Sequence, residues 1–342
     1  MTAPPAFPTQ ALGGRTRLRN VLLNHASLVL LGLVFTVFGV LAPRFFAFEN
    51  LENILVQSSV LLMGAVGMTF VLLAAQIDLS VGSMMFLAAV PAGKLVLGGH
   101  SAGVALGAAV GVALVYGLLN ALVVVKLRVA AFIVTLATLY IGRGLGLYIT
   151  QTRAMNLPES LLAVGTTRVV GLPLPLVAAL VVVALGHYTL SSTPYGRQLY
   201  AVGQDAEGAR KAGLPVQRIR ASVFLVSAVC AGLAGFVTIA RVGVVSPTMG
   251  SQRELAMIAA AVLGGTSLFG GRGQVFPGTV VGALLIQTVE TGLVILNVDP
   301  YLYPLFTAGI IFVAVAIDSL RNLERAKQSL RKIRPLGLPK PR

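Results

Sequence analysis

Long apolar stretches alternate with short polar connections along almost the whole chain. A stretch of about 20 apolar residues is long enough to cross the hydrocarbon core of a membrane as an α-helix. The first stretch, Val21–Leu41, is too long for the core of a signal peptide and lacks a small-x-small cleavage site, so it is expected to be retained. The pattern predicts an all-α, polytopic integral membrane protein with about ten transmembrane helices. The predicted spans are residues 21–41, 53–75, 81–98, 102–125, 130–150, 171–190, 221–240, 254–269, 275–296 and 302–318.

The polar loop 191–220 lies between two of these stretches and carries the signals of one short helix. A capping acid is followed by an acidic first turn, a basic last turn and two residues that end a helix. These residues are, in order, Asp205, Glu207, Arg210, Lys211, Gly213 and Pro215. A helix of two turns is unstable alone in water. We therefore expect a partner to hold it.

Composition agrees with a membrane protein. Of the 342 residues, 56% are hydrophobic and only 11% are charged, and the mean hydropathy is +0.88, whereas soluble domains carry about 25% charged residues. The net charge of +15 does not indicate a nucleic-acid partner, because the basic residues gather at the ends of apolar stretches without interleaved aromatic residues. The lipid bilayer is the expected environment.

The distribution of basic residues also predicts an orientation. If the N-terminus lies in the cytoplasm, most of the 26 Lys and Arg residues lie on the cytoplasmic side, as the positive-inside rule requires. Both termini and the 191–220 loop are then cytoplasmic. Residues 1–20 are expected to be a disordered tail. Residues 319–342 form a basic tail that either fixes the orientation or binds anionic lipid head groups.

Two further patterns concern helix packing. Gly103, Gly107 and Gly111 form a double GxxxG ridge, Gly142 and Gly146 form another, and Gly278 and Gly282 form a third, which predicts close helix contacts there. Residues 67–90 resemble residues 234–262, since both run from an apolar span through a Gly/Ser-containing break into a second apolar segment. An odd number of predicted spans separates the two copies. The sequence therefore predicts an inverted repeat, which is typical of transporters.

Enzyme motifs are almost absent, and no cofactor, metal site or catalytic residue is predicted. Residues 99–103 match G-x-S-x-G, but that motif needs a strand–turn–helix setting, and here it lies in a short interhelical loop. The single Cys230 and the three isolated histidines provide neither a disulfide framework nor a metal-ligand set. There is no P-loop for ATP phosphates. Uphill transport would need an ion gradient or another subunit.

A few polar side chains fall in or beside predicted spans, where a charge costs about 2.5–3.5 kcal/mol at mid-span. Asp78 and Ser80 sit at a helix break and either cap a helix or line a pathway. Arg143 either lines a pathway or pairs with an acid. Glu254 either caps the start of its span or lines a pathway. Glu290 lies in mid-span with Gln287 one turn back on the same face, and it could be a proton-coupling acid.

These features together resemble the permease subunits of bacterial ATP-binding cassette (ABC) importers for monosaccharides, the ribose/xylose/rhamnose-type permeases. The resemblance covers residues from about 50 to 318. It rests on four stretches, which are IDLSVGS at 77–83, FIVTLAT with RGL at 132–145, TPYGRQLYAVGQDAEGARKAGL at 193–214, and ARVGVVSPTMGSQRELAMIAAAVLGGTSLFGGRGQVFPGT at 240–279.

The resemblance implies a permease domain at 21–318 in the bacterial inner membrane, paired with a second permease chain. Its partners would be cytoplasmic ABC ATPase subunits, which hydrolyse the ATP, and an extracytoplasmic sugar-binding protein. Residues 203–214 would be the coupling helix that rests on the ATPase, and the implied ATPase-coupling residues are Arg197, Gly203, Asp205, Glu207, Ala209, Arg210 and Gly213. The motif stretches near the pathway or gate contain Asp78, Ser80, Thr135, Arg143 and Glu254, to which Gln287 and Glu290 are added as pathway candidates.

The sequence departs from the family pattern at several positions, including Ala75-Gln76, Gly208 and Ala256. Glu290-Thr291 replaces the usual pair of Asn residues, which leaves the exact sugar open. Two alternatives are a permease of the same architecture for nucleosides, branched-chain amino acids or an autoinducer, and an ion-coupled secondary transporter that uses Glu290. An intramembrane hydrolase that uses Ser101 is a remote third.

Overall fold

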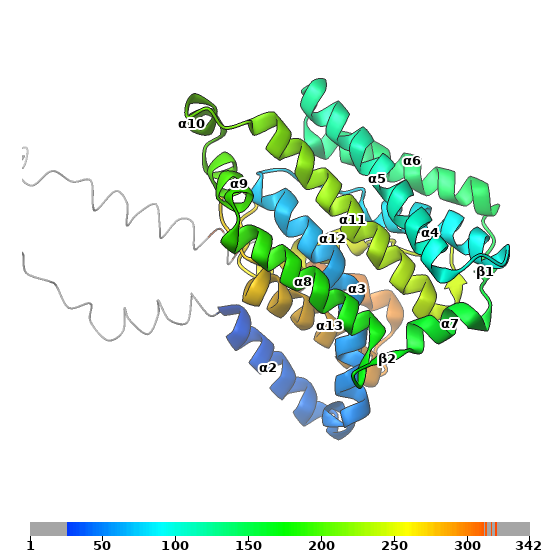
Figure 1. The fold of residues 1–342 in the computed structure, drawn as a ribbon. Helices are drawn as coiled ribbons and strands as arrows, with labels where there is room; N and C mark the ends of the chain where they lie inside the picture. The colour runs from blue at the N-terminus through cyan, green and yellow to red at the C-terminus, as the bar shows by residue number, and fades with distance from the viewer. Residues whose placement is uncertain (1–25, 311, 313–315, 317–318, 320–342) are drawn as a thin grey trace, which may run out of the picture.

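A computed structural model describes residues 26–310, 312, 316 and 319, and it shows one bundle of helices (Figure 1). The tail at 1–20 and almost all of the basic tail at 319–342 lie outside the described residues. The α-helices are α2 (Ala26–Leu41), α3 (Phe48–Leu73), α4 (Val81–Leu97), α5 (Ala102–Lys126), α6 (Ala131–Thr150), α7 (Glu159–Thr166), α8 (Leu174–Ser192), α9 (Pro194–Gln204), α10 (Ala206–Lys211), α11 (Val216–Val242), α12 (Arg253–Leu263) and α13 (Val280–Ile295). Short helical turns are η1 (Pro43–Phe46), η2 (Val275–Thr279) and η3 (Pro300–Leu302).

Six helices among the described residues are long and apolar enough to cross a membrane. They are α3, α5, α6, α8, α11 and the segment Val275–Ile295, which joins η2 to α13 and has non-helical backbone at Phe276. The other predicted spans correspond to shorter helical segments, namely α2, α4, α12 and residues 303–310. The all-α, multi-pass architecture is therefore confirmed, and the count of about ten spans stays a prediction.

The burial of the helices separates the centre of the bundle from its periphery. In the most apolar window of α3, 83% of the residues are buried, whereas the corresponding window of α6 is only 22% buried. Helix α11 is the other central helix, and it packs against α3, α4 and α5. The outer surfaces of α6 and α8 expose large apolar side chains, among them Tyr148 and Leu185. Such surfaces are expected in a protein that is surrounded by lipid.

Two interruptions break the helical order. Residues 74–80 between α3 and α4 are not helical, and residues 243–252 separate α11 from α12 apart from strand β4 (Val244–Val245). The two breaks meet in space, because Glu254 Oε2 and the Gly250 carbonyl oxygen occupy the volume that a side chain on Gly82 would need. The N-terminal ends of α4 and α12 therefore lie against each other inside the protein.

Short strand pairs organise the connection between α6 and α8. Strand β1 (Met155–Asn156) pairs antiparallel with β4, with Met155 opposite Val245. Strand β2 (Arg168–Val169) pairs with β3 (Leu172–Pro173) to form a small hairpin. In Figure 1, α7 and β1 lie at the end of the bundle opposite α9 and α10. One end of the bundle therefore carries α7 and β1, and the other end carries the short helices α9 and α10.

Glycines allow close helix contact at two of the three predicted ridges. A Cβ on Gly142 of α6 would overlap the Tyr116 side chain, and one on Gly146 would overlap the Phe86 ring. A Cβ on Gly282 would overlap the Ala260 carbonyl oxygen of α12, and one on Gly278 would overlap the Gly264 carbonyl oxygen. The prediction of a close contact at this ridge is confirmed. By contrast, Gly107 and Gly111 of α5 have no heavy atom within 4 Å of a built Cβ among the described residues. This face of α5 points outward, so a close contact at this ridge stays a prediction.

This difference predicts opposite effects of the same substitution. Gly282→Ala is expected to lower the melting temperature of the purified protein, because the new methyl group meets a backbone oxygen and overpacking costs about 1–3 kcal/mol. Gly107→Ala is the matched control, and it should leave the melting temperature unchanged or raise it, because alanine is the better helix former. Thermal unfolding in detergent measures both. Equal effects of the two substitutions would contradict the α12–α13 packing described above.

Candidate functional site

The loop 191–220 contains two helices, so the prediction of a single short helix was incomplete. Helix α9 begins at Pro194, and the Thr193 side chain caps it by accepting a hydrogen bond of 3.2 Å from the Gly196 amide. Proline at the first position of a helix and threonine at the N-cap are standard start signals. The short helix α10 follows directly. The missed signal was therefore the Thr193-Pro194 pair.

Helix α10 has the caps that the sequence predicted. Asp205 Oδ1 accepts hydrogen bonds of 3.0 Å from the amides of Glu207 and Gly208. Glu207 and Lys211 form an exposed ion pair of 3.0 Å one turn apart. Gly213 has a φ of +81°, the left-handed conformation that ends many helices. The local chemistry of these residues fixes where α10 begins and ends.

Helix α9 anchors this region to the bundle. The hydroxyl groups of Tyr195 and Ser222 lie 2.7 Å apart, and the Tyr200 hydroxyl donates a bond of 2.8 Å to the Gly273 carbonyl oxygen. Burial raises the pKa of the Tyr200 phenol, which therefore stays protonated as a donor. Gly203 leaves no room for a side chain, because the Leu73 carbonyl oxygen and the Gly271 amide nitrogen lie there. Helix α9 is thus part of the folded core.

The predicted coupling residues divide between support and surface. Gly203 and Ala209 are buried, whereas Arg197, Asp205, Glu207, Arg210 and Gly213 are exposed. Helix α10 projects from the end of the bundle beside α9 (Figure 1). Among the described residues, the ion pair and the side-chain capping bonds of α10 all lie within residues 205–211. A helix of this length with so little support has the form of a docking element.

A buried polar cluster surrounds the break between α3 and α4. Asp78 accepts hydrogen bonds from the Ser80 amide at 3.0 Å, from the Ser80 hydroxyl at 2.6 Å and from the Ser227 hydroxyl of α11 at 3.0 Å. Asn120 of α5 donates to the Ser80 hydroxyl at 2.8 Å. The Thr135 hydroxyl of α6 lies 3.3 Å from the Ile77 carbonyl oxygen. Side chains from three helices, α5, α6 and α11, therefore hold this break in place.

Asp78, Ser80 and Thr135 are fully buried in this conformation. Their side chains support the backbone of the break. Ser80 is the N-cap residue of α4, but its side chain makes no capping bond, so the capping interpretation of Asp78 and Ser80 stays a prediction. Their role in a pathway stays a prediction. Asn120 and Ser227 belong to the cluster and were not predicted, because each lies alone in an apolar helix and no local pattern marks it.

Arg143 of α6 holds the second break. Its Nη1 donates hydrogen bonds to the carbonyl oxygens of Met249, at 2.5 Å, and of Pro247, at 3.4 Å. Its guanidinium carbon lies 5.2 Å from the centre of the Phe86 ring. The hydrogen bonds tie α6 to the segment between α11 and α12, and the ring contact ties α6 to α4. Arg143 thus stabilises loop structure, and a pathway role stays a prediction.

Glu254 lies in the first turn of α12, next to Gly82 of α4. The N-cap of this helix is Gln252, whose side chain makes no capping bond. The Oε2 atom of Glu254 is buried and has no hydrogen-bond partner among the described residues. Buried acceptors are nearly always satisfied in native proteins. This atom is therefore available for a water molecule or a solute hydroxyl group.

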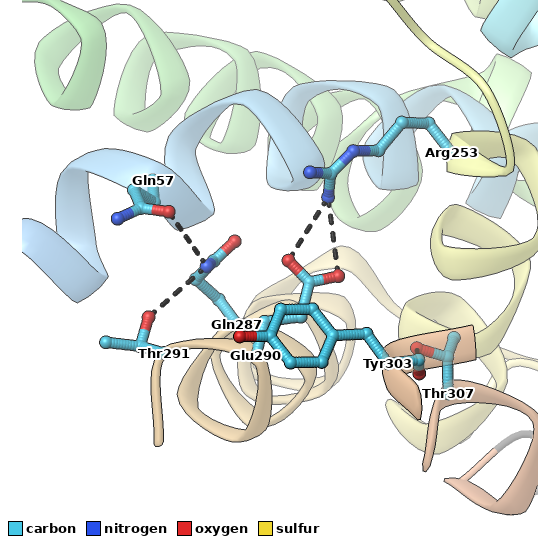
Figure 2. A network of polar contacts seen from close by, with 7 residues as sticks. All are labelled: Gln57, Arg253, Gln287, Glu290, Thr291, Tyr303 and Thr307. Carbon is cyan, nitrogen blue, oxygen red and sulfur yellow. Dashed lines mark hydrogen bonds and ion pairs between the residues drawn. The ribbon is translucent and has the colours of Figure 1, made fainter. Parts of the chain in front are cut away.

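A second polar network lies between α3, α12 and α13 (Figure 2). Arg253 Nη1 lies 3.4 Å from Glu290 Oε2, and both side chains are partly exposed. Gln287 donates hydrogen bonds to Gln57 of α3 at 3.3 Å and to Thr291 at 3.4 Å. Glu290 and Gln287 therefore share one face of α13, as the sequence predicted. The pairing of Glu290 with Arg253 was not predicted.

The predicted pathway residues fall into separate groups. Asp78, Ser80 and Thr135 surround the α3–α4 break, Arg143 and Glu254 flank the meeting point of the two breaks, and Gln287 and Glu290 lie on α13. Within the described part of the chain, no group of three or more His, Cys, Asp or Glu side chains could hold a metal ion.

Known proteins resemble this chain over most of its length. The family model described as "Branched-chain amino acid transport system / permease component" matches residues 50–315. The ribose import permease protein RbsC of Escherichia coli K12 is 36% identical over 320 residues, which are 92% of this chain and 99% of the relative. The D-allose transport system permease protein AlsC of the same strain is 36% identical, with 87% of this chain and 92% of the relative covered.

The autoinducer 2 import system permease protein LsrC of Enterobacter sp. strain 638 is also 36% identical. That alignment covers 87% of this chain and 88% of the relative. No solved structure matches the chain significantly.

The contacts of Arg143 predict how its loss changes the second break. Arg143→Gln removes hydrogen bonds from a charged donor, each of which contributes about 1.5–3 kcal/mol. Amide hydrogen exchange in residues 246–252 should become about tenfold faster or more. Arg44→Gln changes an exposed arginine without a described partner and should leave that exchange unchanged. Unaltered exchange in the Arg143 variant would show that the loop does not depend on it.

Proposed function

The chain belongs to the branched-chain amino acid transport system / permease component family, and from that premise we propose that it forms the translocation pathway of an ABC importer. It is a multi-pass inner-membrane protein with apolar helices, as its relatives and its spans indicate. ATP hydrolysis belongs to a separate cytoplasmic subunit. The observation that carries this proposal is α10, a capped two-turn helix that projects from the end of the bundle.

We infer that the solute is a monosaccharide. Two of the relatives are named for ribose and D-allose transport. The polar network on α13 offers amide, hydroxyl and carboxylate groups, which suit sugar hydroxyl groups. A neutral sugar needs no fixed charge in the membrane. The Arg253–Glu290 pair also gives Glu290 a partner, which weakens the case for a secondary transporter with Glu290 as an isolated coupling acid.

For the pathway, we propose the region where the two breaks meet. Interrupted helices whose N-terminal ends converge near the middle of the membrane are typical of transporter binding sites. The unpartnered Glu254 Oε2 lies at this meeting point. The inverted repeat, about ten spans and cytoplasmic termini complete this proposal. It includes Asp78, Ser80, Thr135 and Arg143 as supports and Glu254, Gln287 and Glu290 as contacts.

The proposed partners follow from the same role. Cytoplasmic ABC ATPase subunits would bind α10, with Arg197, Glu207 and Arg210 presented to them. A second permease chain would complete the pathway, and an extracytoplasmic sugar-binding protein would deliver the solute.

The substrate class can be tested on the complete complex in nanodiscs. ATP hydrolysis is measured with the binding protein and a panel of pentoses, hexoses, deoxysugars, nucleosides, amino acids and autoinducer 2. We expect stimulation by a monosaccharide. Stimulation by a nucleoside, an amino acid or autoinducer 2 alone would replace the sugar in this proposal. If no ATPase co-purifies and uptake follows the proton gradient, the importer proposal is wrong.

The coupling role of α10 is tested by a double substitution. Glu207→Ala with Arg210→Ala removes two exposed charges, so the permease should stay folded while sugar-stimulated ATP hydrolysis falls about tenfold or more. The control is Glu159→Ala with Arg153→Ala, which removes one acid and one base from exposed positions at the other end of the bundle. The control should retain stimulated hydrolysis. Wild-type stimulation in the α10 variant would count against the docking role.

A further inference from the structure

A cavity of about 650 Å³ lies beneath α10, between that helix, the α5–α6 connection and the start of α11. Its polar lining includes the guanidinium groups of Arg128, Arg210 and Arg220 and one carboxylate, that of Glu207. Each of the three arginines comes from a different element. The cavity therefore gathers positive charge from three separate parts of the chain.

The side chains of these arginines have no described polar contact that stabilises the fold. Among the described residues, none of their side chains makes a hydrogen bond or ion pair, and Arg220 Nε is buried without a partner. The only carboxylate in the lining, Glu207, is paired with Lys211 outside the cavity. A buried guanidinium nitrogen without an acceptor is costly. A bound anion would balance the positive charge and supply the missing hydrogen-bond acceptor.

Apart from the amides of Gln76 and Gln217, the rest of the lining is apolar. Val124, Val125, Val129, Ala130 and Ala131 form this wall. The neighbouring side chains Leu127, Phe132 and Ile133 are exposed, with Ile133 at 60%. They lie at the ends of two apolar helices, where the polar head groups of a bilayer meet its hydrocarbon. An occupant must therefore combine an anionic head with an apolar body.

We propose that this cavity binds the phosphate head group of an anionic phospholipid. The phosphate would accept hydrogen bonds from Arg128 and Arg220, and an acyl chain would lie along the apolar wall toward Phe132. Basic pockets at helix ends are known to bind such head groups. The lipid would lie directly under α10, so it would connect the composition of the membrane to the position of the docking helix.

An acidic side chain of the ATPase is the competing occupant. It would satisfy the arginines but would leave the apolar wall and the exposed Leu127, Phe132 and Ile133 unexplained. Lipid binding needs neither the ATPase nor the sugar. The inference rests on the proposed function only for the leaflet, which is the cytoplasmic one if α10 binds the ATPase. It can therefore fail or succeed independently of the transport proposal.

The test uses the full-length permease in neutral detergent, without its partners. Native mass spectrometry measures the binding of phosphatidylglycerol and of zwitterionic phosphatidylcholine, and a thermal shift measures the effect of inorganic phosphate. Phosphatidylglycerol should bind preferentially. Arg128→Gln and Arg220→Gln should each weaken its binding about fivefold, and the double variant about 25-fold, if the two contributions add. Arg218→Gln is the matched control, because it removes an exposed charge from the same turn of α11 but does not line the cavity.

Each outcome decides the proposal. Preferential binding that is lost in the two cavity variants and kept in Arg218→Gln supports it, and rescue by Arg128→Lys would show that charge is what matters. Equal weakening by Arg218→Gln would show a diffuse basic surface and no site.

Stabilisation by phosphate without lipid preference would mean a free-anion site. If no lipid binds, and the backbone amide of Arg128 is protected from hydrogen exchange only when the ATPase is present, the cavity belongs to the interface with the ATPase. If the Arg220→Gln variant fails to fold, lipid binding by the Arg128→Gln variant decides the proposal, because Arg128 is exposed.

Discussion

The backbone of a membrane protein must satisfy its own polar groups, because hydrocarbon offers no hydrogen bonds. This constraint governs the two helix breaks of the chain. Residues 74–80 can leave the helical conformation only because Asp78 and Ser80 receive hydrogen bonds from α5 and α11. Residues 246–252 depend in the same way on the guanidinium group of Arg143. The polar residues that stand out in the sequence are first of all the supports of these breaks.

The break at 74–80 begins where the docking region is anchored. The Leu73 carbonyl oxygen accepts a hydrogen bond of 2.9 Å from the Gly271 amide, and the backbone of Gly203 packs against the same oxygen. A displacement of α9 would therefore act on the last residue of α3, from which the chain leads in five residues to buried Asp78. This continuous packing gives a physical route by which a force on α10 could reach the interior.

The sequence predicted the local features well and the long-range ones poorly. The caps of α10 at Asp205 and Gly213 were predictable, because they depend on neighbouring residues alone. Helix α9 could also have been predicted from Thr193-Pro194. By contrast, the bond between Asp78 and Ser227 joins residues 149 positions apart, and no periodicity reveals it. The glycine ridge of α5 shows the converse, since a packing motif does not say which neighbour, if any, lies opposite.

The Arg253–Glu290 pair bears on how the pathway is completed. Its side chains are 39% and 24% exposed, on helices that otherwise bury apolar surface. A partly exposed ion pair that faced lipid would be expensive, so these charges must face water or another protein chain. Tyr303, from the helical residues 303–310, lies near Glu290 (Figure 2). Either environment fits the proposal above, in which Glu290 contacts the pathway and a second permease chain completes it.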